Sequence, residues 1–147
     1  MYKTILVTLD TTLTDRTIID HVKQLAKFAG GDVVLLHVAT GVPAQWHGPQ
    51  AAGEEVENDQ AYLDRVKAEF EALGISTKAE LDYGEPADKI VSVAAKEHCD
   101  LIAMATHGHR LIKDIVLGSV ANVVRHRTQI PVLLVRAIRG EAAAPGN

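Results

Sequence analysis

Residues 101–119 read LIAMATHGHRLIKDIVLGS, and they join a predicted strand to a predicted helix. Leu101 to Ala105 are all apolar, as in a strand that is buried on both faces. The chain then becomes polar, until Gly118-Ser119 opens a new apolar-periodic segment. Such a loop offers free backbone N–H groups, glycines that let a ligand approach closely, and the positive end of a helix dipole. We therefore expect it to bind an anion, above all phosphate, although its glycines could also serve only to turn the chain.

Five segments are expected to be strands, at residues 5–9, 33–38, 75–83, 101–105 and 130–135. Helical periodicity between them predicts four helices. The first covers residues 15–29, with Thr14 as its N-cap, and the second covers residues 54–73. The third begins at Pro86 and the fourth begins near Ser119. Ser119 is expected either to cap the last helix or to donate to phosphate. Alternating strands and helices indicate an α/β fold with a parallel sheet and helices on both faces. Ligands of such open sheets bind beyond the carboxyl ends of the strands, where the strand order reverses.

Two of the predicted strands have the features of sheet edges. The third alternates polar and apolar residues and should be half exposed. The last strand, Ile130 to Val135, contains Pro131, which indicates an edge, yet it is apolar throughout. An uncovered apolar edge would aggregate, so we expect a second subunit to cover it in a homodimer. Residues 40–54 are rich in glycine and proline and predict a loop around Trp46, either a lid or contact surface or an unstructured insertion.

Composition excludes several classes of protein. The chain has 147 residues, which suits one domain over 1–138 with a disordered tail at 139–147. A net charge of -4 argues against a general nucleic-acid-binding surface. No apolar run approaches the ~18–20 residues that span a bilayer, and no signal peptide is visible, so we expect no membrane partner and a cytoplasmic location. Cys99 is the one cysteine; it is expected to be a buried small residue without a disulfide partner.

At this point the sequence resembles the universal stress protein family. Its nucleotide-binding signature is G-x2-G-x9-G-[ST], and here Gly108 is followed by nine residues and then Gly118-Ser119. The family also has an acidic residue after the first strand, as Asp10 is, a Thr-His-Gly run like that at residues 106–108, and a Pro-Val-Leu strand like that at residues 131–133. The likeness covers residues 2–137.

The resemblance implies a three-layer, Rossmann-like fold of the adenine-nucleotide alpha-hydrolase-like type, with a five-stranded parallel sheet in the order 3-2-1-4-5. It also implies ATP or AMP between strands 1 and 4, with or without Mg²⁺, and dimer formation through the last strand. The positions that match nucleotide-contacting residues of the family are Val38 and Met104 for the adenine, Thr8 and Asp10 for the base and ribose, and Gly108, Gly118, Ser119 and Val120 for the phosphates. One histidine of the loop, His107 or His109, is expected to face the phosphates or the solvent.

One position departs from the family signature, because Ala105 stands where the first glycine is expected. If that residue needs a positive φ, alanine costs ~1–2 kcal/mol. If it only lies close to the ligand, the methyl group narrows the pocket. Either outcome bears on nucleotide affinity and leaves the fold unaffected.

Several chemical readings of single residues remain open. Asp10 is expected to bind a ribose hydroxyl or a metal ion, or to cap the turn into the first helix. His107 and His109 could bind a transition metal with a third ligand, but no cysteine or carboxylate pair at metal-binding spacing supports this, so no metal site is predicted. His37, inside an apolar run, is interpreted as a hydrogen-bonded core histidine.

The loop also contains a Thr-x-Gly-His sequence at residues 106–109, which nucleotidyltransferases use after their first strand; here it follows the fourth. The phosphate-loop sequence G-x4-G-K-[ST] is absent, and so is the acidic pair of a receiver domain. Two function classes remain: a dimeric adenine-nucleotide-binding regulatory protein of the stress response, and a nucleotide-free dimeric interaction module of the same fold. No general base is evident, so catalysis is expected to be at most slow hydrolysis of bound ATP.

Overall fold

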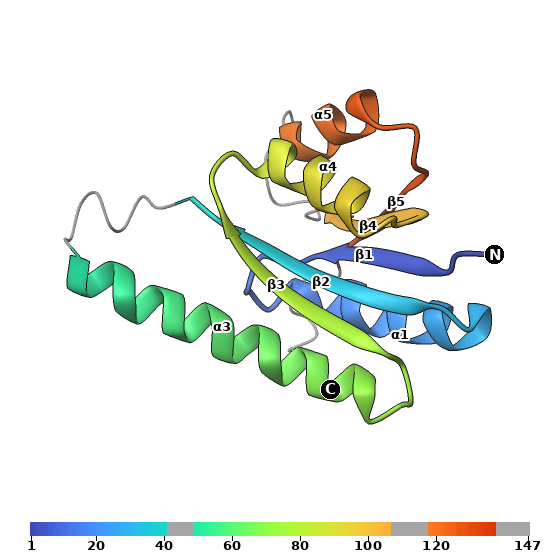
Figure 1. The fold of residues 1–147 in the computed structure, drawn as a ribbon, viewed down its shortest axis with the longest axis horizontal. Coiled ribbons are helices and arrows are strands. Elements are labelled where there is room, and N and C mark those ends of the chain that lie inside the picture. Colours follow the sequence, from blue (N-terminus) through green and yellow to red (C-terminus); the bar gives the residue numbers. More distant parts are fainter. Residues whose placement is uncertain (41–48, 107–117, 138–147) are drawn as a thin grey trace, which may run out of the picture.

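The computed structural model describes residues 1–40, 49–106 and 118–137. Its five strands form one parallel sheet in the order β3-β2-β1-β4-β5 (Figure 1), which confirms the predicted order. The strands are β1 Thr4–Thr8, β2 Asp32–Ala39, β3 Thr77–Tyr83, β4 Leu101–Thr106 and β5 Val132–Arg136. The strand order reverses between β1 and β4, so the predicted switch point lies in the middle of the sheet.

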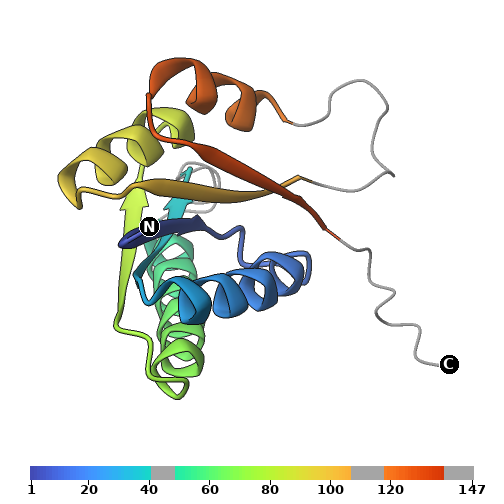
Figure 2. The ribbon, with the colours of Figure 1, turned by 90° about the vertical axis from the view of Figure 1, so that its right-hand side faces the viewer.

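Helices cover both faces of this sheet, as the α/β pattern predicts. Helices α1 (Asp15–Ala29) and α3 (Pro49–Glu71) lie on one face, and α4 (Pro86–Lys96) and α5 (Ser119–Arg127) lie on the other (Figures 1 and 2). The result is a three-layer arrangement. Each layer of helices packs on one face of the sheet and encloses its own hydrophobic core, and β1 contributes side chains to both cores.

The strand β1 shows why the central strands read as continuous apolar runs. Ile5 and Val7 pack toward α1 and α3, whereas Leu6 packs toward α4 and α5, and all three are fully buried. Successive side chains of a strand point to opposite faces, so a strand with helices on both sides needs apolar residues at every position. Burying a side chain of this size contributes roughly 1.5–3 kcal/mol to the stability of the fold. The central strands are therefore held firmly in place, and they position the loops that follow them.

Helix α3 differs from the prediction at both ends. It begins at Pro49, so residues 49–53, which were assigned to the loop, are helical. Proline is favoured at the first helical position, where its missing N–H would have had no helical partner. The helix ends at Glu71, so Leu73, expected in its apolar stripe, lies outside it and is 41% exposed. Gly74 follows with a φ of 80°, a left-handed conformation that favours glycine.

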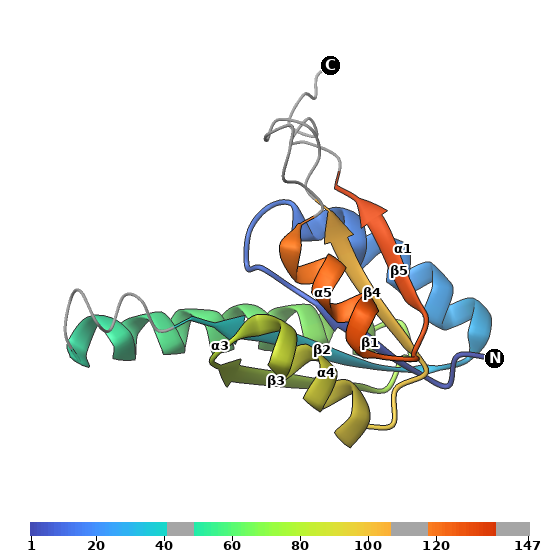
Figure 3. The ribbon, with the colours of Figure 1, turned by 90° about the horizontal axis from the view of Figure 1, so that it is seen from above.

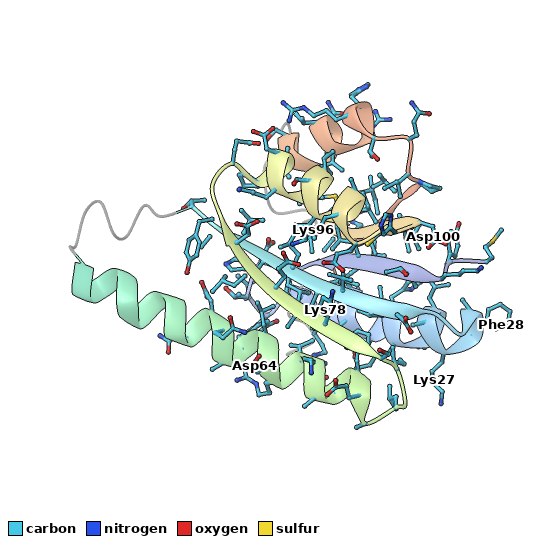
Figure 4. The ribbon with its side chains drawn as sticks, in the orientation of Figure 1. Lys27, Phe28, Asp64, Lys78, Lys96 and Asp100 are labelled. Carbon is cyan, nitrogen blue, oxygen red and sulfur yellow. The ribbon has the colours of Figure 1, made fainter. Side chains whose placement is uncertain are left out.

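The strands β5 and β3 form the two edges, as expected. The strand β5 begins at Val132 and not at Ile130, so Pro131 lies just before it. Because it lies outside the strand, the proline removes no N–H from the ladder within it. Its carbonyl accepts a hydrogen bond from the Ile102 N–H at 3.0 Å. At the other edge the middle of β3 is half buried, and two ion pairs of 2.7 Å, Lys78–Glu97 and Lys96–Glu80, join this strand to α4 and the turn after it (Figure 4).

Cys99 is buried in the core beneath α4, as predicted, and burial raises the pKa of its thiol to about 11. Within the three described ranges, no helix has the length and apolar character needed to cross a membrane. Trp46 and the predicted tail at 139–147 lie outside the described residues.

Candidate functional site

A cavity of about 410 Å³ opens at the carboxyl ends of β1, β2 and β4, beside the first residues of α5. Figure 3 shows α4 and α5 on the face of the sheet that borders this cavity. Its volume lies within the ~300–1,000 Å³ that is typical of small-molecule sites. The cavity is at the point where the strand order reverses, which is where open α/β sheets bind ligands.

The structure brings together the predicted site residues that it describes. Eight of them line this cavity, namely Thr8, Asp10, Val38, Met104, Ala105, Gly118, Ser119 and Val120. The other two, Gly108 and His109, lie outside the described residues, as does His107. These eight positions come from four different elements or the loops beside them, so only the folded chain makes them neighbours.

Eight further lining residues were not predicted as site residues. They are Leu9, Leu36, His37, Thr40, Pro86, Ile90, Thr106 and Ala121. Thr40 and Thr106 could have been found, because they stand at the carboxyl ends of β2 and β4, where the sheet rule places ligands. Pro86 and Ile90 gave no such signal, since their place at the cavity depends on how α4 packs on the sheet.

The lining combines two kinds of surface. Val38, Met104 and Val120 offer apolar side chains, whereas Thr8, Asp10 and Ser119 carry oxygen atoms. Such a cavity can hold a ligand that has an apolar, flat part and a part rich in hydroxyl or charged groups. Polar groups that are few and fixed in place give a site of this kind its specificity.

The start of α5 supplies the anion-binding feature that the sequence predicted. Gly118 is the N-cap of this helix, with φ 69° and ψ 129°. This conformation favours glycine, because a residue with a Cβ atom is strained in it. The suggestion that Ser119 is the N-cap is therefore wrong, because Ser119 is the first residue of the helix itself. The first N–H groups of a helix have no intrahelical partners and carry the positive end of its dipole, so they attract anions into this end of the cavity.

The structure decides between the two expectations for Ala105. This residue lies within β4 and is half buried, and the described non-glycine residues with positive φ are Tyr2, Thr11 and His98. Alanine at this position is therefore not strained. Its effect on a ligand would come from its methyl group, because Ala105 lines the cavity.

The Asp15 carboxylate closes the turn from β1 to α1. The Asp15 carboxylate accepts hydrogen bonds from the Asp10 N–H at 2.9 Å and from the Thr11 N–H at 2.8 Å. Asp10 itself is exposed and lines the cavity. Thr14 occupies the N-cap position of α1, as predicted, but its side chain makes no capping hydrogen bond; its hydroxyl is 2.7 Å from that of Thr12.

His37 is hydrogen-bonded, as its interpretation as a core histidine requires, and it also faces the cavity. Its Nδ1 lies 2.8 Å from the Leu9 carbonyl oxygen, which can only accept, so Nδ1 carries the proton. Its Nε2 lies 3.4 Å from Oδ2 of Asp59, a buried residue of α3. Both ring nitrogens therefore face protein groups. No group of three metal-ligating side chains occurs among the residues placed by the structure, and His107 and His109 are not among these.

Comparison with known proteins shows the family of the chain. The model of the universal stress protein family matches residues 1–136. The chain belongs to the universal stress protein family. Universal stress protein MJ0577 of Methanocaldococcus jannaschii is 30% identical over 155 aligned residues, covering 92% of this chain and 96% of that protein.

Solved structures of the family have the same fold. The MJ0577 structure matches with a TM-score of 0.81, covering 95% of this chain and 99% of that one. A universal stress protein in complex with cAMP matches at 22% identity with a TM-score of 0.70, covering 92% and 97% of the two chains. A universal stress protein of Archaeoglobus fulgidus in complex with dAMP matches at 20% identity with a TM-score of 0.68, covering 91% and 98%. At these two identities the likeness shows the shared fold.

Proposed function

We propose that this universal stress protein binds an adenine nucleotide, ATP or AMP, and acts as a cytoplasmic regulatory protein of the stress response. The observation that carries the proposal is the cavity at the β1/β4 switch point. It is lined by all eight of the described residues that the family resemblance predicted at the nucleotide site. Family members of the same fold have been solved with cAMP and with dAMP, which supports an adenine nucleotide over other ligands.

Each part of the nucleotide has a counterpart in the cavity. Val38 and Met104 would contact the adenine, and Thr8 and Asp10 would face the base and the ribose. Ser119 and the backbone at Gly118 and Val120 would hold the phosphates at the start of α5, together with Gly108 and His109 of the signature. Asp10 is a carboxylate among the cavity residues that the structure describes, so it would supply an oxygen ligand to a Mg²⁺ ion bound with ATP.

The residues at the cavity favour binding over catalysis. A general base must have a lone pair directed at the proton that it removes. His37 carries the one imidazole among the described cavity residues, and both of its nitrogens face protein groups. We therefore propose that His37 does not act as a general base and that hydrolysis of bound ATP is at most slow, which an assay of phosphate release tests.

Calorimetric titration with ATP, AMP and GTP tests this function. We expect heat of binding with the adenine nucleotides and weaker or no binding of GTP. Gly118→Ala should weaken adenine-nucleotide binding, because a methyl group at φ 69° forces the start of α5 to shift, at about 1–2 kcal/mol.

Gly30→Ala is the matched control for this substitution. Gly30 has nearly the same φ, 71°, at the end of α1, and a methyl group there meets nothing within 4 Å. This variant should lose similar stability and keep its nucleotide affinity. No heat from the unmodified protein at millimolar ATP or AMP would contradict the proposal.

Ala105 supports a second candidate function. Its methyl group takes up room at the cavity where the family signature has glycine. If this excludes nucleotides, the chain is a nucleotide-free dimeric interaction module of the same fold. The same titration separates the two functions, because the second predicts no binding by the unmodified protein.

A further inference from the structure

The most deeply buried charged side chain in the described part of the chain belongs to Asp15, which does not line the cavity. Asp15 is 1% exposed. A carboxylate withdrawn from water in this way is costly unless hydrogen-bond donors surround it. Burial raises its pKa, and the hydrogen bonds that it receives oppose this shift.

Two of the donors are backbone N–H groups of the loop that carries Asp10. The Asp10 N–H lies 2.9 Å from Oδ1 and 3.1 Å from Oδ2, and the Thr11 N–H lies 2.8 Å from Oδ2. The Asp15 carboxylate thus holds the main chain of this loop. The residues that it holds include Asp10, which supplies the one carboxylate among the described residues of the cavity lining.

The loop needs to be held, because Thr11 has a φ of 62°. A β-branched residue in this left-handed region is an outlier that persists only where the surroundings enforce it. The Thr11 N–H bond to Asp15 is such an enforcing contact. Without it, the loop would relax toward an ordinary conformation and turn Asp10 with it.

A third donor comes from a different element. The Tyr62 hydroxyl of α3 donates to Oδ2 of Asp15 at 2.7 Å, across 47 residues of sequence. Burial and the bond to Asp15 both raise the pKa of Tyr62, so its hydroxyl keeps its proton and stays a donor at neutral pH. The orientation of the Asp15 carboxylate therefore depends on where α3 lies.

We propose that Asp15 and Tyr62 are positioning residues of the nucleotide site, which together hold Asp10 in the orientation that binds the ribose hydroxyls. This inference rests on the function proposed above. It assigns a role in ribose recognition to Tyr62, which does not itself line the cavity.

The first experiment needs no nucleotide. Hydrogen exchange of the Asp10 and Thr11 amides is measured by NMR in the unmodified protein and in Tyr62→Phe, which removes only the hydroxyl. We expect both amides to exchange faster in the variant, while amides of β1 and α1 keep their rates. Tyr83→Phe removes the hydroxyl of an exposed tyrosine at the end of β3 and should change neither amide. Unchanged exchange at Asp10 and Thr11 in Tyr62→Phe would overturn the proposal.

The second experiment measures ribose recognition by comparing the affinities for AMP and 2′-deoxy-AMP. The unmodified protein should prefer AMP, and Tyr62→Phe should weaken AMP binding about 5- to 10-fold, the equivalent of one hydrogen bond, while hardly changing 2′-deoxy-AMP binding. Asp15→Asn should have a larger effect, because its amide nitrogen cannot accept from a backbone N–H.

A double variant separates positioning from a loss of stability. If Tyr62 acts through Asp10, then Asp10→Ala with Tyr62→Phe should bind AMP no more weakly than Asp10→Ala alone. Additive losses would contradict the proposal, since a general loosening of the fold acts independently of Asp10. Binding of neither nucleotide by the unmodified protein refutes the proposed function, and ribose positioning with it. An unaltered AMP preference in Tyr62→Phe refutes the positioning role alone.

Discussion

At the scale of single residues, Ala105 has the most direct bearing on function. It is unstrained within β4 and lines the cavity, so its methyl group is the feature that distinguishes this site from the family signature. A glycine at this position would leave more room for the ligand without requiring any change in the path of the strand.

We therefore predict that Ala105→Gly tightens ATP and AMP binding. The variant should also lose about 0.5–1 kcal/mol of stability, because glycine in a strand gives up more conformational freedom on folding. Calorimetry and denaturant unfolding measure the two effects. Ala103→Gly is the matched control, since Ala103 lies two residues earlier in β4, is fully buried and does not line the cavity. It should lose stability without a gain in affinity. If Ala105→Gly binds no more tightly, the methyl group does not limit binding.

At the scale of elements, α1 and α3 are joined by a cluster of charged side chains. Glu69 of α3 lies 2.8 Å from Arg16 and 2.6 Å from Lys23, both on α1. Two hydrogen bonds lower the pKa of Glu69 from 4.5 to about 2, and the bond from Arg16 contributes more than the bond from Lys23. The cluster fixes α3 against α1, and α3 also carries Tyr62 and Asp59, which contact Asp15 and His37.

This cluster predicts a specific loss of stability in acid. A carboxyl whose pKa is lower in the folded than in the unfolded protein stabilises the fold above pH 4.5, and this contribution disappears as the pH falls toward 2. Glu69→Gln should cost up to about 1 kcal/mol at pH 7, because partly exposed ion pairs are screened by water. The difference from the unmodified protein, measured by urea unfolding, should shrink below pH 4.5.

Glu71→Gln serves as a control within the same helix. Glu71 forms an ion pair with Lys67 of the same helix, so its loss should hardly change the docking of α3 on α1. A Glu69→Gln effect that stays constant from pH 7 to pH 3 would show that the carboxylate charge is not the cause.

At the scale of the whole molecule, the edge strand β5 indicates how two copies would meet. Leu133 and Val135 pack partly against the core on the α1 side, whereas Leu134 is 38% exposed. We propose a homodimer whose two-fold axis pairs the β5 strands of two copies antiparallel, so that alternate side chains fill a shared core. This would cover an apolar edge that no described element of the same chain pairs with.

Leu134→Lys is expected to convert this dimer to a monomer, because its side chain is exposed in the single chain and lysine fits there without disturbing the fold. Leu133→Lys should have the same effect together with a loss of stability, since Leu133 is partly buried. Light scattering gives the molecular mass of each variant. Phe28→Lys replaces another exposed apolar residue, on α1 and 90% exposed, and should stay dimeric (Figure 4). A monomeric unmodified protein at tens of micromolar would refute the dimer.

The sequence by itself determined the order of the elements, the parallel sheet and the ends of the strands at which a ligand would bind. It could do so because apolar periodicity reports, residue by residue, which face of an element is buried. Ile5 to Val7 and Leu101 to Met104 are continuous apolar runs, and both are buried central strands. The glycine signature located the start of α5, since glycine is needed at the φ that Gly118 adopts.

Only the tertiary structure decided how the cavity is supported. Nothing in the pattern around Asp15 shows that its carboxylate would hold the Asp10 loop, or that Tyr62, 47 residues later, would hold that carboxylate. The same is true of the contact between His37 and Asp59 and of the place of Pro86 at the cavity. The reason is physical: periodicity records burial along one element, whereas the partner of a buried polar group depends on how two elements pack against each other. That packing is a property of the whole core, to which many residues contribute and which no local pattern of residues encodes.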